Sequence, residues 1–114
     1  MSTSLNIVQP VLPPGPAADD RPVLSVVLPM YNEQGNLERL FPRLTAALSG
    51  LGVSYEVVCV DDGSRDATLD RLVAEHLRDP HVKVLALSRN FGKEVALTAA
   101  VSHARGDAVV AVDA

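Results

Sequence analysis

Cysteine, tryptophan and runs of positive charge are scarce or missing in this sequence. Its 114 residues include one cysteine and no tryptophan, and aromatic residues make up only 4%. One cysteine excludes a disulfide framework within the chain, which favours a cytoplasmic location. Cys59 lies in the apolar run 57–60, where we expect it to be a small buried hydrophobic residue.

Basic clusters and long apolar stretches are also missing. The formal net charge is −4 at pH 7, so electrostatic binding along nucleic acid or an anionic membrane is not expected. The sequence shows neither a signal-peptide pattern nor an apolar stretch near the roughly 18 residues of a membrane span. With 47% hydrophobic residues, the composition is that of one globular domain.

Proline is concentrated at the N-terminus. Residues 1–22 hold five of the eight prolines and have little apolar periodicity. This composition predicts a flexible N-terminal segment over residues 1–22, followed by a folded domain over residues 23–114.

The rest of the chain alternates between two apolar patterns. Short apolar runs predict β-strands at residues 23–28, 55–60, 82–87 and 108–112. Apolar residues at helical spacing predict helices at 37–48, 66–77 and 90–105. This order predicts an α/β fold of the Rossmann-like three-layer αβα kind, with a mostly parallel sheet and helices on both faces.

Two prolines should shape these elements. Pro29 is expected to stop the first strand. Pro42 lies inside the first helix, so we expect either a kink there or a helix that begins later than Asn36.

Carboxylates follow three of the predicted strands. Glu33 comes shortly after the first strand, Asp61 and Asp62 follow the second, and Asp113 follows the last. Parallel sheets bind ligands outside the carboxyl ends of their strands, so these residues should converge on one crevice. Such a crevice suits a nucleotide and a divalent cation.

Individual residues suggest how a nucleotide would bind. Tyr31 could stack on a planar base, while Glu33 and Asp62 could accept hydrogen bonds from base or ribose. Asp113 offers a hard oxygen ligand for Mg²⁺ or Mn²⁺ shared with a diphosphate. Lys93 and Arg89 could contact phosphates, or could be a solvated helix residue and a partner of an acidic neighbour.

A purely structural interpretation competes with each of these roles. Asp61, Asp62 and Asp66 could cap the helix that follows them, and we expect Asp66 to do so. Asn32 could likewise cap the first helix, with Glu33 in its first turn. The two interpretations are compatible.

Four motifs in order resemble family 2 glycosyltransferases. They are Pro29-Met30-Tyr31-Asn32-Glu33, Val60-Asp61-Asp62-Gly63-Ser64, the stretch 88–94 (Ser-Arg-Asn-Phe-Gly-Lys-Glu), and 106–114. The third motif resembles the branch that includes dolichol-phosphate mannose synthase and bacterial undecaprenyl-phosphate glycosyltransferases. The resemblance covers residues 23–114 and implies the N-terminal part of a GT-A fold.

The resemblance also implies roles for single residues. It places Pro29, Tyr31, Glu33, Val60 and Asp62 around the base and ribose of a nucleotide sugar. Asp113 and Ala114 match the first two positions of an Asp-x-Asp motif, which makes Asp113 the implied catalytic and metal-binding residue. The second metal ligand would be residue 115, beyond the end of this chain.

The implied reaction is transfer of a sugar from a UDP- or GDP-linked donor to a polyprenyl phosphate, with inversion and with Mg²⁺ or Mn²⁺. The acceptor-binding and membrane-associated parts of such enzymes have no match here, so we expect an N-terminal fragment of a protein that acts at the cytoplasmic face of a membrane. Two alternatives stay open: a nucleotide-binding fragment without turnover, and a receiver-like signalling module. The latter would want its acidic pair after the first strand.

Overall fold

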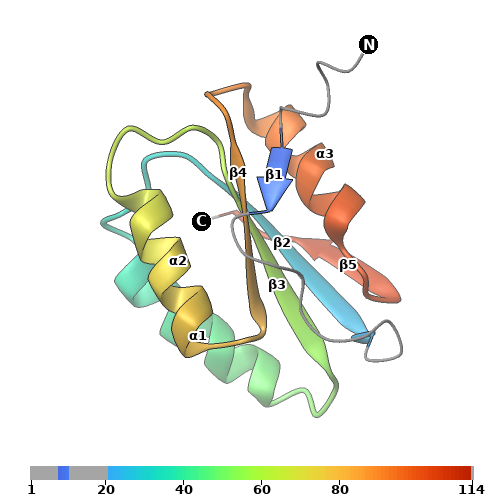
Figure 1. The fold of residues 1–114 in the computed structure, drawn as a ribbon. Helices are drawn as coiled ribbons and strands as arrows, with labels where there is room; N and C mark the ends of the chain where they lie inside the picture. Colours follow the sequence, from blue (N-terminus) through green and yellow to red (C-terminus); the bar gives the residue numbers. More distant parts are fainter. Residues whose placement is uncertain (1–7, 11–20, 114) are drawn as a thin grey trace.

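A five-stranded sheet with helices on both faces forms the framework of the protein in a computed structural model that describes residues 8–10 and 21–113 (Figure 1). In chain order the elements are β1 (Val8–Pro10), β2 (Leu24–Met30), α1 (Leu37–Ser49), β3 (Tyr55–Asp61), α2 (Thr68–Arg78), β4 (Val82–Leu87), α3 (Lys93–His103) and β5 (Ala108–Ala111). The predicted alternation of strands and helices is confirmed.

The strand order is β1-β4-β3-β2-β5. The four strands β4, β3, β2 and β5 are parallel, as predicted. The chain moves outward from β2 through β3 to β4 and then returns to place β5 on the other side of β2. This reversal creates a switch point between β2 and β5, where the loops after the two strands diverge and leave room for a ligand.

The sequence analysis did not predict β1. Residues Val8–Pro10 pair antiparallel with β4, with Gln9 opposite Ala86. These three residues lie in the segment 1–22, for which the sequence predicted no strand. Residues 1–7 and 11–20 lie outside the described part of the chain.

Successive side chains of the strands supply two separate apolar layers. On one face, α1 and α2 pack on the sheet through buried side chains at Leu37, Phe41, Leu48 and Leu72, against Val26, Leu28, Val57 and Cys59. On the other face, α3 packs through Ala96, Ala99 and Ala100 against Val27, Val58, Val60 and Leu85. Figure 1 shows α1 and α2 together on one side of the strands and α3 on the other. The predicted three-layer αβα arrangement is confirmed.

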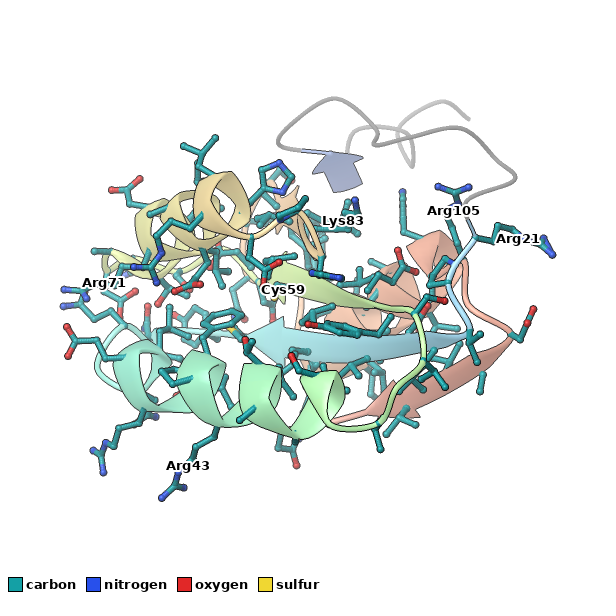
Figure 2. All side chains as sticks on the ribbon, turned by 90° about the horizontal axis from the view of Figure 1, so that it is seen from below. Arg21, Arg43, Cys59, Arg71, Lys83 and Arg105 are labelled. Atoms are coloured by element: carbon teal, nitrogen blue, oxygen red, sulfur yellow. The ribbon has the colours of Figure 1, made fainter. Side chains whose placement is uncertain are left out.

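Cys59 is one of the fully buried residues, as predicted. Figure 2 shows it in the interior of the molecule, whereas Arg43 projects outward from α1. Burial raises the pKa of the Cys59 thiol far above its ordinary value, with a smaller contribution from the negative charge of Glu75. Cys59 is therefore a packing residue.

Pro29 does not stop the first strand, because β2 continues to Met30. The carbonyl of Val27 accepts from the N–H of Val112 on the β5 side, and the carbonyl of Met30 accepts from Asp62 on the β3 side. Backbone groups of alternate residues point to alternate sides, so Pro29 faces the β5 side beyond the last pair of that ladder. The missing N–H of Pro29 therefore removes no ladder hydrogen bond.

Two helix starts also bear on the predictions. Helix α1 begins at Leu37, as predicted, and contains the exposed Pro42 as its sixth residue. Helix α3 begins at Lys93 rather than at Asn90, because residues 90–92 bend around Asp62 instead of continuing the helix. No helix in the described ranges combines the length and apolar character needed to cross a membrane.

Candidate functional site

A cavity of about 390 Å³ opens at the carboxyl ends of the parallel strands, next to the switch point between β2 and β5. Its lining residues are Pro29, Met30, Tyr31, Glu33, Asp62, Asn90, Gly92, Lys93 and Asp113. They come from the ends of β2 and β3 and the loops after them, from the residues after β5, and from the segment before α3 together with its first residue. The structure thus brings six of the predicted site residues into one cavity: Pro29, Tyr31, Glu33, Asp62, Lys93 and Asp113.

Asp62 is the most heavily hydrogen-bonded residue of the cavity wall. Its side chain is buried, with 3% exposed, and its Oδ1 accepts from the N–H of Phe91 at 2.8 Å. Its Oδ2 accepts from the N–H of Gly92 at 3.1 Å and from Nδ2 of Asn90 at 3.3 Å. Asp62 therefore does not cap α2 and instead holds the segment that precedes α3.

The neighbouring carboxylate, Asp61, has a different environment. It is buried, its Oδ2 accepts from the N–H of Ser64 at 3.2 Å, and its Oδ1 has no hydrogen-bond partner. Burial raises the pKa of Asp61, which outweighs the opposite effect of the hydrogen bonds from Ser64. Asp61 does not line the cavity, so it belongs to the turn that supports the cavity.

Asp66 performs the capping role expected of it, although from one position earlier than a standard cap. The first residue of α2 is Thr68 and its N-cap is Ala67. Asp66 Oδ1 accepts from the backbone N–H of Thr68 at 2.9 Å and from its hydroxyl. Burial acts against ionisation, but the hydrogen bonds from Thr68 and Gln34 outweigh it and lower the pKa of Asp66.

Hydrogen bonds connect the loop after β2 to the loop after β3. The N–H of Asn32 donates to Ser64 Oγ at 2.9 Å, and Oδ1 of Asn32 accepts from the N–H of Arg65 at 2.9 Å. The N–H of Glu33 donates to Thr68 Oγ1 at 2.8 Å. Asn32 has the left-handed φ of 53°, which asparagine tolerates better than most residues. Asn32 and Glu33 therefore do not cap α1, and the capping alternative is wrong for them.

These hydrogen bonds between the loops hold Tyr31 and Glu33 at the cavity. Tyr31 is 40% exposed, so its ring is available as a platform for a planar group. The carboxylate of Glu33 accepts from Asn36 Nδ2 at 2.6 Å through Oε1. One face of the cavity thus offers an aromatic ring beside a hydrogen-bond acceptor.

The opposite wall carries an ion pair. Lys93 Nζ lies 2.6 Å from Asp113 Oδ1, and the side chains are 65% and 76% exposed. Exposed pairs of this kind contribute at most about 1 kcal/mol, so each partner can exchange the other for a ligand. Lys93 is thus more than a solvated helix residue, because it pairs with a carboxylate inside the cavity.

Two of the predicted site residues that the structure describes, Val60 and Arg89, do not line the cavity. Val60 is fully buried in the layer under α3, so its side chain cannot contact a ligand. Arg89 does not line the cavity, and its guanidinium lies 4.8 Å from the centroid of the Phe91 ring rather than on an acidic neighbour. Ala114 lies outside the described residues.

Three lining residues were not predicted as site residues. Asn90 stood in a quoted motif without an assigned role, and Met30 and Gly92 were not singled out. Gly92 has a φ of 106°, which favours glycine. Gly92 is the third residue of the helix predicted over residues 90–105, and a glycine so near a helix start is the sequence signal that could have marked this turn.

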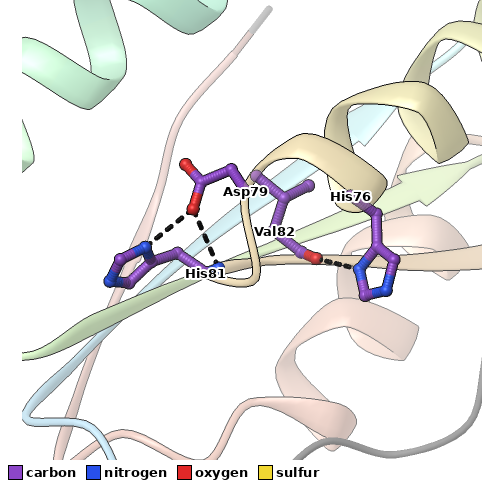
Figure 3. A network of polar contacts seen from close by, with 4 residues as sticks. All are labelled: His76, Asp79, His81 and Val82. Carbon is purple, nitrogen blue, oxygen red and sulfur yellow. Dashed lines mark hydrogen bonds and ion pairs between the residues drawn. The ribbon is translucent and has the colours of Figure 1, made fainter.

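The end of the sheet away from the cavity is closed by other polar contacts. His76 Nδ1 contacts the carbonyl of Val82, which joins α2 to β4, and His81 Nδ1 lies 2.7 Å from Asp79 Oδ1 (Figure 3). The ring of His81 also stacks on Tyr55 with 4.2 Å between centroids. These two histidines have structural contacts far from the predicted site.

A known protein family matches most of the chain. The model of the family "Glycosyl transferase family 2" matches residues 25–114. The chain belongs to glycosyl transferase family 2. An uncharacterized glycosyltransferase of Synechocystis is 50% identical over 91 residues, which are 80% of this chain and 29% of that protein. An undecaprenyl-phosphate 4-deoxy-4-formamido-L-arabinose transferase of Salmonella paratyphi A is 41% identical over 92 residues, 80% of this chain and 28% of that protein.

Two solved structures share the fold. A mannosyltransferase from Pyrobaculum calidifontis, in complex with GDP-Man and Mn²⁺, superposes with a TM-score of 0.66 at 28% identity over 87% of this chain and 29% of that chain. S. aureus TarS with UDP-GlcNAc gives a TM-score of 0.63 at 32% identity, over 79% of this chain and 26% of that chain. The prediction of the GT-A glycosyltransferase fold is confirmed.

This family 2 chain spans less than a third of the length of the relatives it matches, 29% and 28% of the two named above. Activity, substrates and partners of a whole protein are therefore matters for proposal. The receiver-like alternative loses its basis, because the acidic pair follows β3, the second of the parallel strands, and the family is that of glycosyl transferases.

The metal expected for this family finds one suitable ligand among the described residues. Asp113 offers a hard, exposed carboxylate in the cavity wall, which fits Mg²⁺ or Mn²⁺. Within residues 8–10 and 21–113, no group of three or more His, Cys, Asp or Glu side chains could hold a metal ion. Among the described residues, Asp113 is therefore the side chain that would hold such an ion.

Proposed function

We propose that this chain binds the nucleotide-sugar donor, UDP- or GDP-linked, of a glycosyltransferase whose acceptor is a polyprenyl phosphate. The observation that carries the proposal is the single cavity that gathers Tyr31, Glu33, Asp62, Lys93 and Asp113 at the switch point of the sheet. A ring, two acceptors and a lysine–carboxylate pair match the three parts of such a donor: its base, its ribose and its diphosphate.

The residues divide between the two ends of the donor. Tyr31 stacks on the base, and Pro29 and Glu33 lie beside the base and ribose on the β2 side. Asp62 lies between the two walls, and Oδ1 keeps room for one further donor beside the N–H of Phe91. Lys93 binds a phosphate oxygen when it leaves Asp113, and Asp113 is freed for the diphosphate end.

The proposed reaction needs little from a general base. A phosphate nucleophile is already ionised at neutral pH, so it can displace the nucleoside diphosphate at the anomeric carbon, with inversion. Charge builds up on the leaving diphosphate, and positive groups nearby stabilise it. Lys93 supplies one such group, and a divalent cation on Asp113 would supply further positive charge.

The named relatives support the chemistry. One relative acts with undecaprenyl phosphate according to its name, and the two solved neighbours hold GDP-Man with Mn²⁺ and UDP-GlcNAc. These ligands belong to those proteins and share one chemistry, a nucleoside diphosphate sugar. By analogy we place the whole protein at the cytoplasmic face of a membrane.

The first test is direct binding. Calorimetry with UDP and GDP, with and without Mn²⁺, should show binding that Tyr31→Ala weakens about tenfold, because base stacking on an aromatic ring contributes about 1–3 kcal/mol. Tyr55→Ala is the control, since Tyr55 stacks on His81 away from the cavity. Equal affinity of the wild type and Tyr31→Ala would contradict the proposed site.

A second candidate is binding of the nucleotide without turnover. The cavity supports this candidate through the same contacts, because the roles proposed for Tyr31, Glu33 and Lys93 are binding roles. Transfer of labelled sugar from donor to a polyprenyl phosphate separates the two candidates. Binding with no transfer in the longest expressed form of the protein would favour the second.

A further inference from the structure

Asp62 has an unusual position for a ligand-binding carboxylate, because most of its bonding capacity is already used. Three donors approach its two oxygens, from Asn90, Phe91 and Gly92. The side-chain amide of Asn90 also donates to the backbone carbonyl of Asp62 at 3.0 Å, and the N–H of Asp62 donates to Met30. Asp62, which directly follows β3, thus connects the end of β2 to the segment before α3.

The same segment is pressed against the residue that follows Asp62. A Cβ on Gly63 would lie 2.3 Å from the backbone atoms of Arg89 and Asn90, closer than any real contact. Gly92, at the other end of the segment, has a φ of 106° and turns the chain into α3. Hydrogen bonds to Asp62 and close packing on Gly63 therefore determine the path of residues 89–92.

Lys93 follows this segment directly, and its ammonium group reaches Asp113 in the cavity. The direction of a side chain at the first residue of a helix depends on where that helix begins. Asp62 sets this start by binding the two N–H groups that precede Lys93. The carboxylate of Asp62 thereby determines where the ammonium group of Lys93 lies.

We propose that Asp62 is a positioning residue that holds segment 90–92 and, through it, orients Lys93 toward the phosphates of the donor. This inference rests on the proposed function and adds to it, because it makes the affinity for the phosphates depend on a residue that the family resemblance places at base and ribose.

The chemistry of the carboxylate is essential to this role. An ionised aspartate only accepts hydrogen bonds, which suits three N–H donors. An asparagine at the same position keeps the shape but would turn its own N–H₂ group toward at least one of these donors. Asp62→Asn is therefore expected to release the segment although it hardly changes the volume of the side chain.

A double-mutant cycle tests the coupling between Asp62 and Lys93. Affinities for UDP and GDP, and for the nucleosides without phosphates, are measured for the wild type, Asp62→Asn, Lys93→Met and the double variant. Lys93→Met should weaken diphosphate binding about tenfold in the wild type and less than about twofold in the Asp62→Asn background. It should leave nucleoside binding unchanged in both.

Asp61→Asn is the matched control, because it makes the same substitution at the adjacent carboxylate, which does not line the cavity. In that background Lys93→Met should keep its full tenfold effect. Hydrogen exchange supplies an independent readout: the amides of Phe91 and Gly92 should exchange faster in Asp62→Asn and not in Asp61→Asn.

Each outcome separates the inference from the proposed function. If the wild type binds neither UDP nor GDP, the proposed function fails and the inference fails with it. If the wild type binds and Lys93→Met weakens diphosphate binding by the same factor with Asp or with Asn at position 62, the inference alone is overturned. Gly92→Ala, which strains the same segment at a positive φ, replaces Asp62→Asn in the cycle should that variant not fold.

Discussion

At the scale of single residues, three aspartates within six positions have three different functions. Asp61 is buried with one unpartnered oxygen, Asp62 holds a distant segment, and Asp66 binds the first residue of α2. Side chains of one chemical type therefore differ by what surrounds them. Their environments lead to separate predictions for stability and for pH dependence.

Gly63 should be the least replaceable glycine in the turn after β3. Gly63→Ala combines a left-handed φ of 69° with a Cβ that meets backbone at 2.3 Å, so it should lower the free energy of unfolding by about 2–4 kcal/mol. Gly52→Ala is the control, since its φ is 72° but nothing lies within 4 Å, and it should cost about 1 kcal/mol. Urea unfolding measures both, and equal costs would contradict the close approach.

Asp61 and Asp66 should give opposite pH dependences. The pKa of Asp61 is raised in the folded state, so above the ordinary value of 3.8 the folded protein holds this proton more firmly than the unfolded chain does. The contribution of Asp61 to the free energy of unfolding therefore falls as the pH rises from 3.8 to the folded-state value. Its effect is therefore destabilising toward neutral pH, and Asp61→Asn should stabilise the protein at pH 7 more than in acid. Chemical unfolding at several pH values measures this difference.

The pKa of Asp66 is lowered, so its stabilising effect is present above 3.8 and is lost as the pH falls through the folded-state value. Asp66→Asn should therefore cost stability at pH 7 and little in acid. The same pH trend for both asparagine variants would contradict the assigned environments.

At the scale of elements, β5 depends on contacts at its start. It pairs with β2 alone, and all four of its residues are exposed. The buried carboxylate of Glu56 accepts from Ser25 Oγ at 2.6 Å and from the N–H of Arg105 at 2.7 Å, and Ser25 Oγ accepts from Gly106. This network anchors the turn from α3 into β5, and β5 in turn carries Asp113.

Glu56→Ala should loosen β5. It removes two hydrogen bonds to a charged group and takes the acceptor away from the buried hydroxyl of Ser25, which costs about 2 kcal/mol or more. The amides of Ala108 and Val112, which donate to Val23 and Val27, should exchange faster. Glu38→Ala, at an exposed carboxylate 3.6 Å from Arg71, is the control. Unchanged exchange in Glu56→Ala would refute the anchoring role.

At the scale of the whole molecule, the strand order concentrates the polar chemistry at one end. The sheet is apolar on both faces, and its carboxyl-terminal edge carries the cavity. A ligand that binds this cavity in the folded state alone must stabilise the entire chain. UDP or GDP at a hundredfold excess over its dissociation constant should add about 2.7 kcal/mol to the free energy of unfolding.

Thermal unfolding with each nucleotide measures this effect and also compares the two bases. Lys93→Met should reduce the shift, and Arg43→Met, at an exposed position on α1, should not. A shift that is identical in the wild type and Lys93→Met would argue against phosphate binding beside Lys93.

Much of the fold could be predicted because it depends on local patterns. Apolar runs marked the four parallel strands, and β4 was predicted with its observed bounds. The boundaries that failed depend on contacts distant in the sequence. Pro29 is accommodated in β2 because β5 ends before it, and α3 starts late because Asp62 binds Phe91 and Gly92.

The sequence by itself determined the α/β class, the burial of Cys59 and the ordered motifs that identify the family, since hydrophobic periodicity and residue order are properties of the chain. Only the tertiary structure decided which side chains meet. Lys93 and Asp113 are twenty positions apart and pair in the cavity, while Val60 turns into the core beside Asp61. The reason is geometric: strand order and the alternation of side chains place residues in space, and neither can be read from neighbouring residues alone.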